Sequence, residues 1–178
     1  MKILAFAASS SKNSINKKLV GFAASYFVGN EIEILDLNDY EMPIFSVDRA
    51  EENGIPQPAI QFAGKIDLSD LIIISFAEHN GAYTAAFKNI FDWLSWIPNQ
   101  TVWRNKPMFL LATSTGQRGG LSVLEMAKNR FPRHEGNVVE TFSLPNFNDN
   151  FDMEKGITTT SYLLDFEQKI ERIKHNYD

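Results

Sequence analysis

Four serines lie close together between the first apolar run of the chain and the first segment of helical periodicity. The segment reads Ser9-Ser10-Ser11-Lys12-Asn13-Ser14-Ile15-Asn16. One serine or asparagine suffices to cap a helix, so four hydroxyls within six positions exceed what capping requires. Hydroxyls and free amides at a helix N-terminus bind anions, because the helix dipole points at the same place. The spacing therefore predicts a phosphate-binding loop.

Two further polar segments each follow an apolar run of strand length. The first is Ala77-Glu78-His79-Asn80-Gly81, whose Asn-Gly pair is also typical of an ordinary solvated turn. The second is Ser114-Thr115-Gly116-Gln117-Arg118-Gly119-Gly120. Its glycines let backbone amides approach a flat ligand, although a flexible entry to a helix has the same composition. At one edge of one sheet, the three segments would form a single polar site.

Alternating strands and helices must position these loops. Apolar runs of strand length occupy residues 2–7, 31–36, 70–75, 107–113 and 138–143. Helical spacing of apolar residues predicts helices within residues 15–27, 57–67, 85–97, 120–131 and 159–175. This alternation predicts one α/β doubly wound domain over residues 1–178, with a parallel sheet between helical layers. By analogy, five strands fit the flavodoxin-like order 2-1-3-4-5, in which ligands bind beyond the carboxyl ends of the strands.

Composition and charge narrow the possible functions. The net charge is −5 and no basic run occurs, which argues against nucleic acid as a partner. The absence of cysteine excludes disulfides and thiolate nucleophiles, and the three histidines lack the spacing of metal ligands. No stretch has the length of a membrane span, and the N-terminal apolar run is too short for a signal peptide. We therefore expect a cytoplasmic protein without a membrane partner.

Signatures of other nucleotide-binding and hydrolytic enzymes are missing from the sequence. No Gly-Lys-Ser/Thr follows the first strand, as a P-loop NTPase requires, and the first turn lacks the glycines of a Rossmann dehydrogenase. Gly-x-Ser-x-Gly, the nucleophile elbow of many hydrolases, is also absent. No catalytic dyad is evident.

In order and spacing, the three polar segments resemble the NADPH-dependent FMN reductase family of flavodoxin-like proteins. The family's Gly-Ser-x-Arg-x-x-Ser-x-Asn corresponds to residues 8–16, and its Pro-Glu-Tyr-Asn to residues 77–80, followed by Lys-Asn at 88–89. Its Ser-x-Gly with Arg-Gly-Gly corresponds to residues 114–120, and the similarity spans about residues 2–145. The chain departs from the family at three positions: Ser11 replaces arginine, Ala77 replaces proline and His79 replaces tyrosine.

The resemblance implies bound FMN, NADPH as electron donor, and a small acceptor: flavin, quinone, azo compound or metal oxyanion. Because hydride transfer is the chemistry of the cofactor, no catalytic residue is expected. Position by position, the resemblance assigns cofactor binding to Ser9, Ser11, Ser14, Asn16, Ala77, Glu78, His79, Asn80, Ser114, Thr115 and Gly116. Without the arginine, the phosphate would depend on amides, hydroxyls and Lys12, which predicts weaker FMN binding. The sequence itself does not choose between NADH and NADPH.

Two other functions of the same scaffold stay open at this point, a flavodoxin-type electron carrier and a flavin-free interaction protein. Such carriers tend to be more acidic than this chain, which favours the enzyme. Trp93, Trp96 and Trp103 lie within eleven residues, and clustered aromatics mark interfaces, although packing within the chain has the same signature. Because the resembling family commonly forms dimers, we expect a homodimer or a dimer of dimers.

Overall fold

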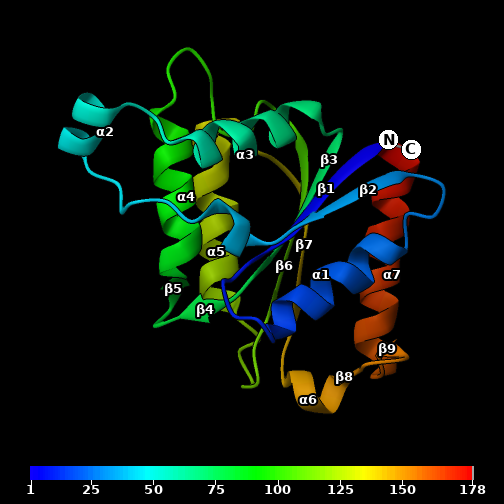
Figure 1. Cartoon of the computed structure of the whole chain (residues 1–178). Coiled ribbons are helices and arrows are strands. Elements are labelled where there is room, and N and C mark those ends of the chain that lie inside the picture. Colours follow the sequence, from blue (N-terminus) through cyan, green and yellow to red (C-terminus); the bar gives the residue numbers. More distant parts are fainter. Residues whose placement is uncertain (178) are drawn as a thin grey trace.

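One five-stranded parallel sheet forms the centre of the computed structural model, which describes residues 1–177 (Figure 1). Its strands are β1 (Lys2–Ala8), β2 (Glu31–Leu35), β3 (Leu71–Phe76), β6 (Pro107–Thr113) and β7 (Asn137–Leu144). The spatial order is β2-β1-β3-β6-β7, and every neighbouring pair is parallel. This confirms the five predicted strands, their order and the flavodoxin-like α/β class. The alternating EIEIL of β2 is mostly exposed, as befits an edge strand, whereas LIIISF of β3 is wholly buried.

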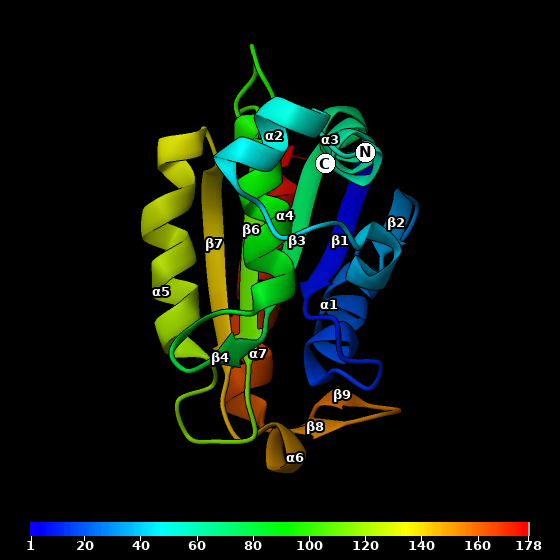
Figure 2. The same cartoon turned by 60° about the vertical axis from the view of Figure 1, so that its left-hand side comes forward.

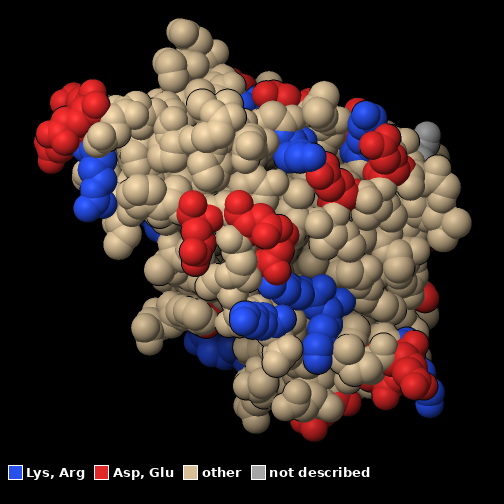
Figure 3. Space-filling view, in the orientation of Figure 1, with Lys and Arg blue, Asp and Glu red and all other residues tan. Residues whose placement is uncertain are grey.

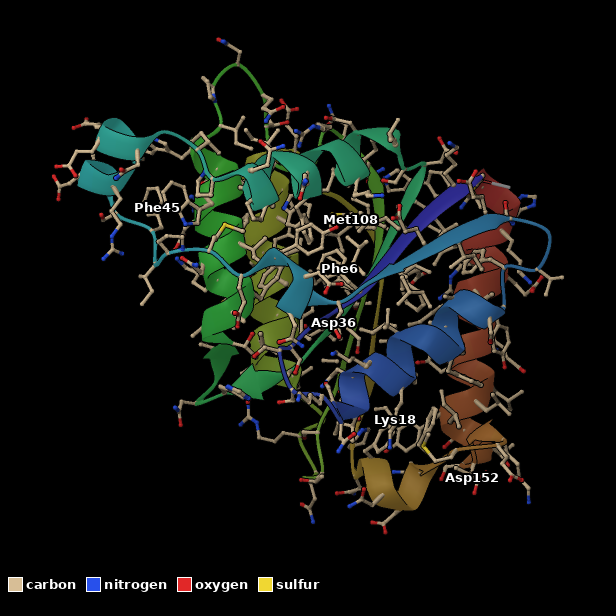
Figure 4. The ribbon with its side chains drawn as sticks, in the orientation of Figure 1. Phe6, Lys18, Asp36, Phe45, Met108 and Asp152 are labelled. Carbon is tan, nitrogen blue, oxygen red and sulfur yellow. The ribbon has the colours of Figure 1, made fainter. Side chains whose placement is uncertain are left out.

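Helices cover both faces of the sheet (Figures 1 and 2). On one face lie α1 (Ile15–Ser25) and α7 (Thr160–Tyr177), and on the other lie α3 (Gln57–Leu68), α4 (Ala85–Trp96) and α5 (Leu121–Arg130). Successive residues of β1 point to opposite faces, so Ile3 and Ala5 join one apolar core while Leu4 and Phe6 join the other. Figure 4 shows Phe6 and Met108 in the second core, between the sheet and α3 and α4. Within the described residues, no helix is long and apolar enough to cross a membrane.

Several short elements were not predicted from the sequence, because they span too few residues to show a periodic pattern of apolar side chains. They are the 3-10 helices Leu37–Tyr40 and Phe131–His134, the helices α2 (Val47–Asn53) and α6 (Phe147–Asn150), and the hairpins β4 (Glu78–His79)–β5 (Ala82–Tyr83) and β8 (Phe151–Asp152)–β9 (Gly156–Ile157). Contacts with distant parts of the chain accompany some of them. Phe151 on β8 packs edge-on against Phe22 of α1, for example, with ring centroids 5.6 Å apart.

The structure decides between the two interpretations of the clustered tryptophans. Trp93 and Trp103 are buried inside the chain, and only Trp96 keeps a substantial exposed surface. Trp93 Nε1 donates to the carbonyl of Pro43 at 2.7 Å, and Trp103 stacks on Phe91 at 5.7 Å. Packing within the chain therefore accounts for two of the three, because the segment after β2 and the loop before β6 both fold back onto α4.

Candidate cofactor-binding site

The loops after β1, β3 and β6 meet at the carboxyl end of the sheet (Figure 2). There they border a cavity of about 300 Å³. Its lining consists of Ser9, Ser11, Asn13, Ser14, Ile15, Asn16, Ala77, Glu78, His79, Thr113, Ser114 and Thr115. The chain crosses from β1 to β2 on one side and continues to β3 on the other, so the cavity lies at the topological switch point of the sheet.

All but two of the residues predicted for the site line this cavity. Asn80 instead forms the turn of the β4–β5 hairpin with Gly81, at φ of 53° and 77°, so the ordinary turn reading describes this pair. Gly116 also lies outside the lining, and its carbonyl accepts the amides of Gly119 and Asn146. Sequence reasoning missed Asn13, Ile15 and Thr113. Of these, Thr113 could have been predicted, because a hydroxyl residue at the carboxyl end of a buried strand lies where ligands bind in such sheets.

The first wall of the cavity carries two buried hydroxyls at the N-terminus of α1. Ser14 caps the helix, since its Oγ accepts the amide of Asn16 at 3.2 Å, and Ser9 Oγ accepts the amide of Ser11 at 3.3 Å. In the described part of the chain neither hydroxyl donates a hydrogen bond, so each still has a proton to donate. No acidic residue stands in the first turn of α1 to repel an anion.

Charges of both signs surround the start of α1. Figure 3 shows basic side chains beside acidic ones on this face, and Figure 4 places Asp36 close to the start of the helix. Lys17 is bonded to Asp36, with Nζ 2.5 Å from Oδ2, so its charge is already balanced. Lys12 is exposed in the serine-rich loop, and among the described residues it has no ion pair, although it does not line the cavity.

Asn16 lines the cavity but directs its amide group into the protein. Its Nδ2 donates to the carbonyl of Thr113 at 3.2 Å, and its Oδ1 accepts the Thr113 amide at 3.1 Å and the Ser75 hydroxyl at 2.8 Å. These bonds join the start of α1 to the ends of β3 and β6. The side chain therefore holds the loops together, and we expect it to support the site rather than to contact a ligand.

The second wall is the β4–β5 hairpin. Thr84, which follows the hairpin, donates its hydroxyl to the carbonyl of Ala8 at 3.0 Å and caps α4 through the amide of Phe87. Glu78, on the first strand of the hairpin, reaches across to α5, where its Oε2 accepts the amide of Val123 at 3.0 Å. The hairpin is thus attached both to the end of β1 and to the helix beyond the third loop.

The third wall is the loop of residues 114–120. Gly119 and Gly120 have φ of 58° and 74°, which few residues other than glycine adopt. A Cβ on Gly119 would lie 2.5 Å from Ser143 Oγ, and one on Gly120 would lie 3.0 Å from the Cβ of Ala112. Close packing on β6 and β7 therefore requires these glycines. Backbone conformation and packing are therefore sufficient to explain why glycine occupies positions 119 and 120, without the approach of a ligand.

Fold and site together define a flavodoxin-like protein with a serine-rich loop beside a cavity at the switch point of a parallel sheet. The sequence model of the NADPH-dependent FMN reductase family matches residues 1–149. The chain belongs to this family. The predicted oxidoreductase class, FMN as cofactor and NAD(P)H as electron donor are thereby confirmed.

Individual proteins are similar to this chain over most of its length. An uncharacterized protein of Mycoplasma pneumoniae is 28% identical over 158 residues, which cover 86% of this chain and 93% of the relative. A quinone reductase of Escherichia coli K12 is 26% identical over 144 residues, covering 75% and 76% of the two chains. Among solved structures, the flavoenzyme NAD(P)H:(acceptor) oxidoreductase FerB of Paracoccus denitrificans has a TM-score of 0.77 at 21% identity, covering 96% of this chain and 93% of its own. At that identity the structural likeness supports the fold.

Proposed function

We propose that the chain binds FMN across the cavity at the carboxyl end of the sheet and passes electrons from NAD(P)H to a small diffusible acceptor. A quinone is the first candidate acceptor, because a relative of this chain is a quinone reductase. The observation that carries the proposal is the pair of buried, proton-bearing hydroxyls at the start of α1, which open into a cavity between two further loops. Because such an enzyme needs a supply of nicotinamide coenzyme, we propose that the protein is located in the cytoplasm.

The residues present fit the cofactor. Ser9 and Ser14 would donate their hydroxyls to the FMN phosphate, with the free amides of the serine-rich loop beside them. Residues 77–79 on one side and 114–115 on the other would border the flavin ring. Bound FMN supplies hydride acceptance from nicotinamide and electron transfer to the acceptor. The task of the protein is to hold the ring and to leave part of it accessible.

Anaerobic stopped-flow reduction tests the proposed activity against the electron-carrier alternative. We expect NADPH or NADH to bleach the flavin absorbance of the FMN-loaded protein within seconds, and a quinone to restore it. A flavodoxin-type carrier would be reduced by dithionite but not by either nicotinamide within minutes. A flavin-free interaction protein would be colourless after purification and would not quench the fluorescence of added FMN. Either of these outcomes contradicts the proposal.

Restoring the family arginine at position 11 should strengthen FMN binding. Ser11 is exposed at the rim of the cavity, so Ser11→Arg places a guanidinium near the phosphate without burying it. We expect FMN to bind about tenfold more tightly, the effect of one charge-assisted hydrogen bond, and riboflavin to be unaffected. Ser11→Gln is the matched control because it has a long polar side chain without the charge. Fluorescence titration with both flavins measures the effect, and equal affinities of Ser11→Arg and Ser11→Gln for FMN would contradict it.

We also propose that the chain forms a homodimer or a dimer of dimers. Figure 1 shows α2 standing out beyond α4, and three apolar side chains in this region are exposed: Ile44 (76%), Val47 (45%) and Trp96 (41%). Phe45 packs against Trp96 with ring centroids 5.6 Å apart, which joins the two parts into one patch. Patches of this kind on a protein surface mark contacts with another chain.

Light scattering measures the mass that tests this assembly. We expect a dimeric or tetrameric mass for the wild type and a smaller mass for Trp96→Glu, since burying an unpaired carboxylate at an interface is unfavourable. Leu164→Glu is the control, because Leu164 is an exposed apolar residue of α7, on the other face of the sheet. A monomeric wild type at high concentration would refute the proposed dimer.

A further inference from the structure

Helix α5 begins without a capping side chain of its own. Its N-cap is Gly120, which offers no side chain to accept the free amides of the first turn. A serine or aspartate would be strained in this place, because the position has φ of 74° and an added Cβ would lie 3.0 Å from that of Ala112. The carbonyl of Arg118 accepts the Leu121 amide at 3.0 Å, whereas the Val123 amide bonds to a side chain from another part of the chain.

Glu78 supplies this acceptor from the β4–β5 hairpin, 45 residues earlier in the sequence. Its Oε2 accepts the Val123 amide at 3.0 Å, in the first turn of α5. A carboxylate suits this place because it forms a charge-assisted hydrogen bond and interacts favourably with the positive end of the helix dipole. We call this bond between Glu78 and Val123 the clasp.

The clasp joins two walls of the proposed flavin site. Residues 77–79 line one side of the cavity and lie on or next to the hairpin, whereas residues 113–115 line another side and lead into α5 through Gly119 and Gly120. At its other end the hairpin is attached to β1 by the bond from Thr84 to Ala8. Among the described residues, no side-chain hydrogen bond other than the clasp joins the hairpin to the third wall or to α5.

We propose that Glu78 is a positioning residue that sets the separation of the two loops on either side of the flavin ring. It acts through the Val123 amide, in contrast to the direct cofactor contact that the family resemblance assigned to it. The inference rests on the proposed FMN site. Because the phosphate loop is not part of the clasp, loss of the clasp should affect the ring site and leave the phosphate contacts intact.

Two substitutions separate this role from a direct contact. Glu78→Ala removes the acceptor, and we expect it to weaken FMN and riboflavin by the same factor, about tenfold, as for the loss of one hydrogen bond. Glu78→Gln keeps an oxygen that can accept the Val123 amide, and we expect both affinities to stay within about threefold of wild type. A loss confined to FMN, equal losses in Glu78→Gln and Glu78→Ala, or unchanged binding in Glu78→Ala would each overturn the inference.

Ser46→Ala is the matched control. Ser46 caps α2 by accepting the Arg49 amide at 3.2 Å, so this variant also loses one helix cap, but far from the cavity. We expect a similar fall in melting temperature for Ser46→Ala and Glu78→Ala, with flavin binding weakened in Glu78→Ala alone. If Ser46→Ala weakened both flavins equally, general destabilisation would explain the result and the inference would fail. Should Glu78→Ala not fold, Glu78→Asp, whose shorter side chain withdraws the acceptor, replaces it with the same expected pattern.

Amide hydrogen exchange tests the clasp without any flavin. In the cofactor-free protein we expect the Val123 amide to exchange faster in Glu78→Ala than in the wild type, while Ser46→Ala leaves it unchanged. If the wild type binds neither flavin, the proposed function fails, and the exchange measurement still decides whether Glu78 caps α5. Unchanged exchange at Val123 would overturn the inference whatever the flavin result.

Discussion

Replacing Ser9 and Ser14 together with alanine is expected to weaken FMN binding by about a hundredfold while riboflavin binding changes little. Each of these buried hydroxyls can donate to the phosphate, and a hydrogen bond to a charged group contributes about 1.5–3 kcal/mol. Riboflavin lacks the phosphate and so loses neither bond. Titrations of the apo-protein with both flavins, followed by quenching of flavin fluorescence, measure the two affinities directly.

Two controls make this result specific. Ser10→Ala changes an exposed serine of the same loop that does not line the cavity, and it should leave both affinities unchanged. Because Ser14 also caps α1, Ser14→Asp keeps a capping oxygen while adding a negative charge, so it should weaken FMN and preserve the helix. If the double variant lost FMN and riboflavin equally, the hydroxyls would not be the phosphate site.

Asn16→Ala is expected to lower the free energy of unfolding by about 3 kcal/mol, the largest stability effect among the polar residues of the site. The substitution leaves the amide and carbonyl of Thr113 and the hydroxyl of Ser75 without their partner. Asn16, Ser75 and Thr113 are almost completely buried, so water does not replace the lost bonds without rearrangement. Urea denaturation of the apo-protein, with the slope checked against wild type, measures the change.

Ser75→Ala is the matched control for this prediction. It removes only the hydroxyl that donates to Asn16 Oδ1, and both bonds between Asn16 and Thr113 remain. We expect a loss of about 1 kcal/mol for this variant. If Asn16→Ala were no less stable than Ser75→Ala, Asn16 would not hold the loops together. Its assignment as a direct ligand of the phosphate would then gain support.

Local patterns in the sequence were sufficient to predict the framework. Apolar runs marked all five strands of the central sheet and helical periodicity marked the five long helices, because both depend on residues that are close in sequence. The strand order followed from analogy with folds of the same alternation. The three polar loops were found for the same reason, since each directly follows a strand and the carboxyl ends of parallel strands share one edge of the sheet.

The roles of individual residues in those loops were decided only by the tertiary structure. Asn16 and Glu78 both read as ligands of a cofactor, yet their side chains bond to backbone groups that lie 97 and 45 residues away. Gly119 and Gly120 read as an opening for a flat ligand, but contacts with β6 and β7 require them. The clustered tryptophans were compatible with an interface or with packing within the chain, and the structure shows Trp93 and Trp103 buried inside the chain. A sequence pattern shows which groups a loop contains, whereas their hydrogen-bond partners depend on which distant segments folding brings beside it.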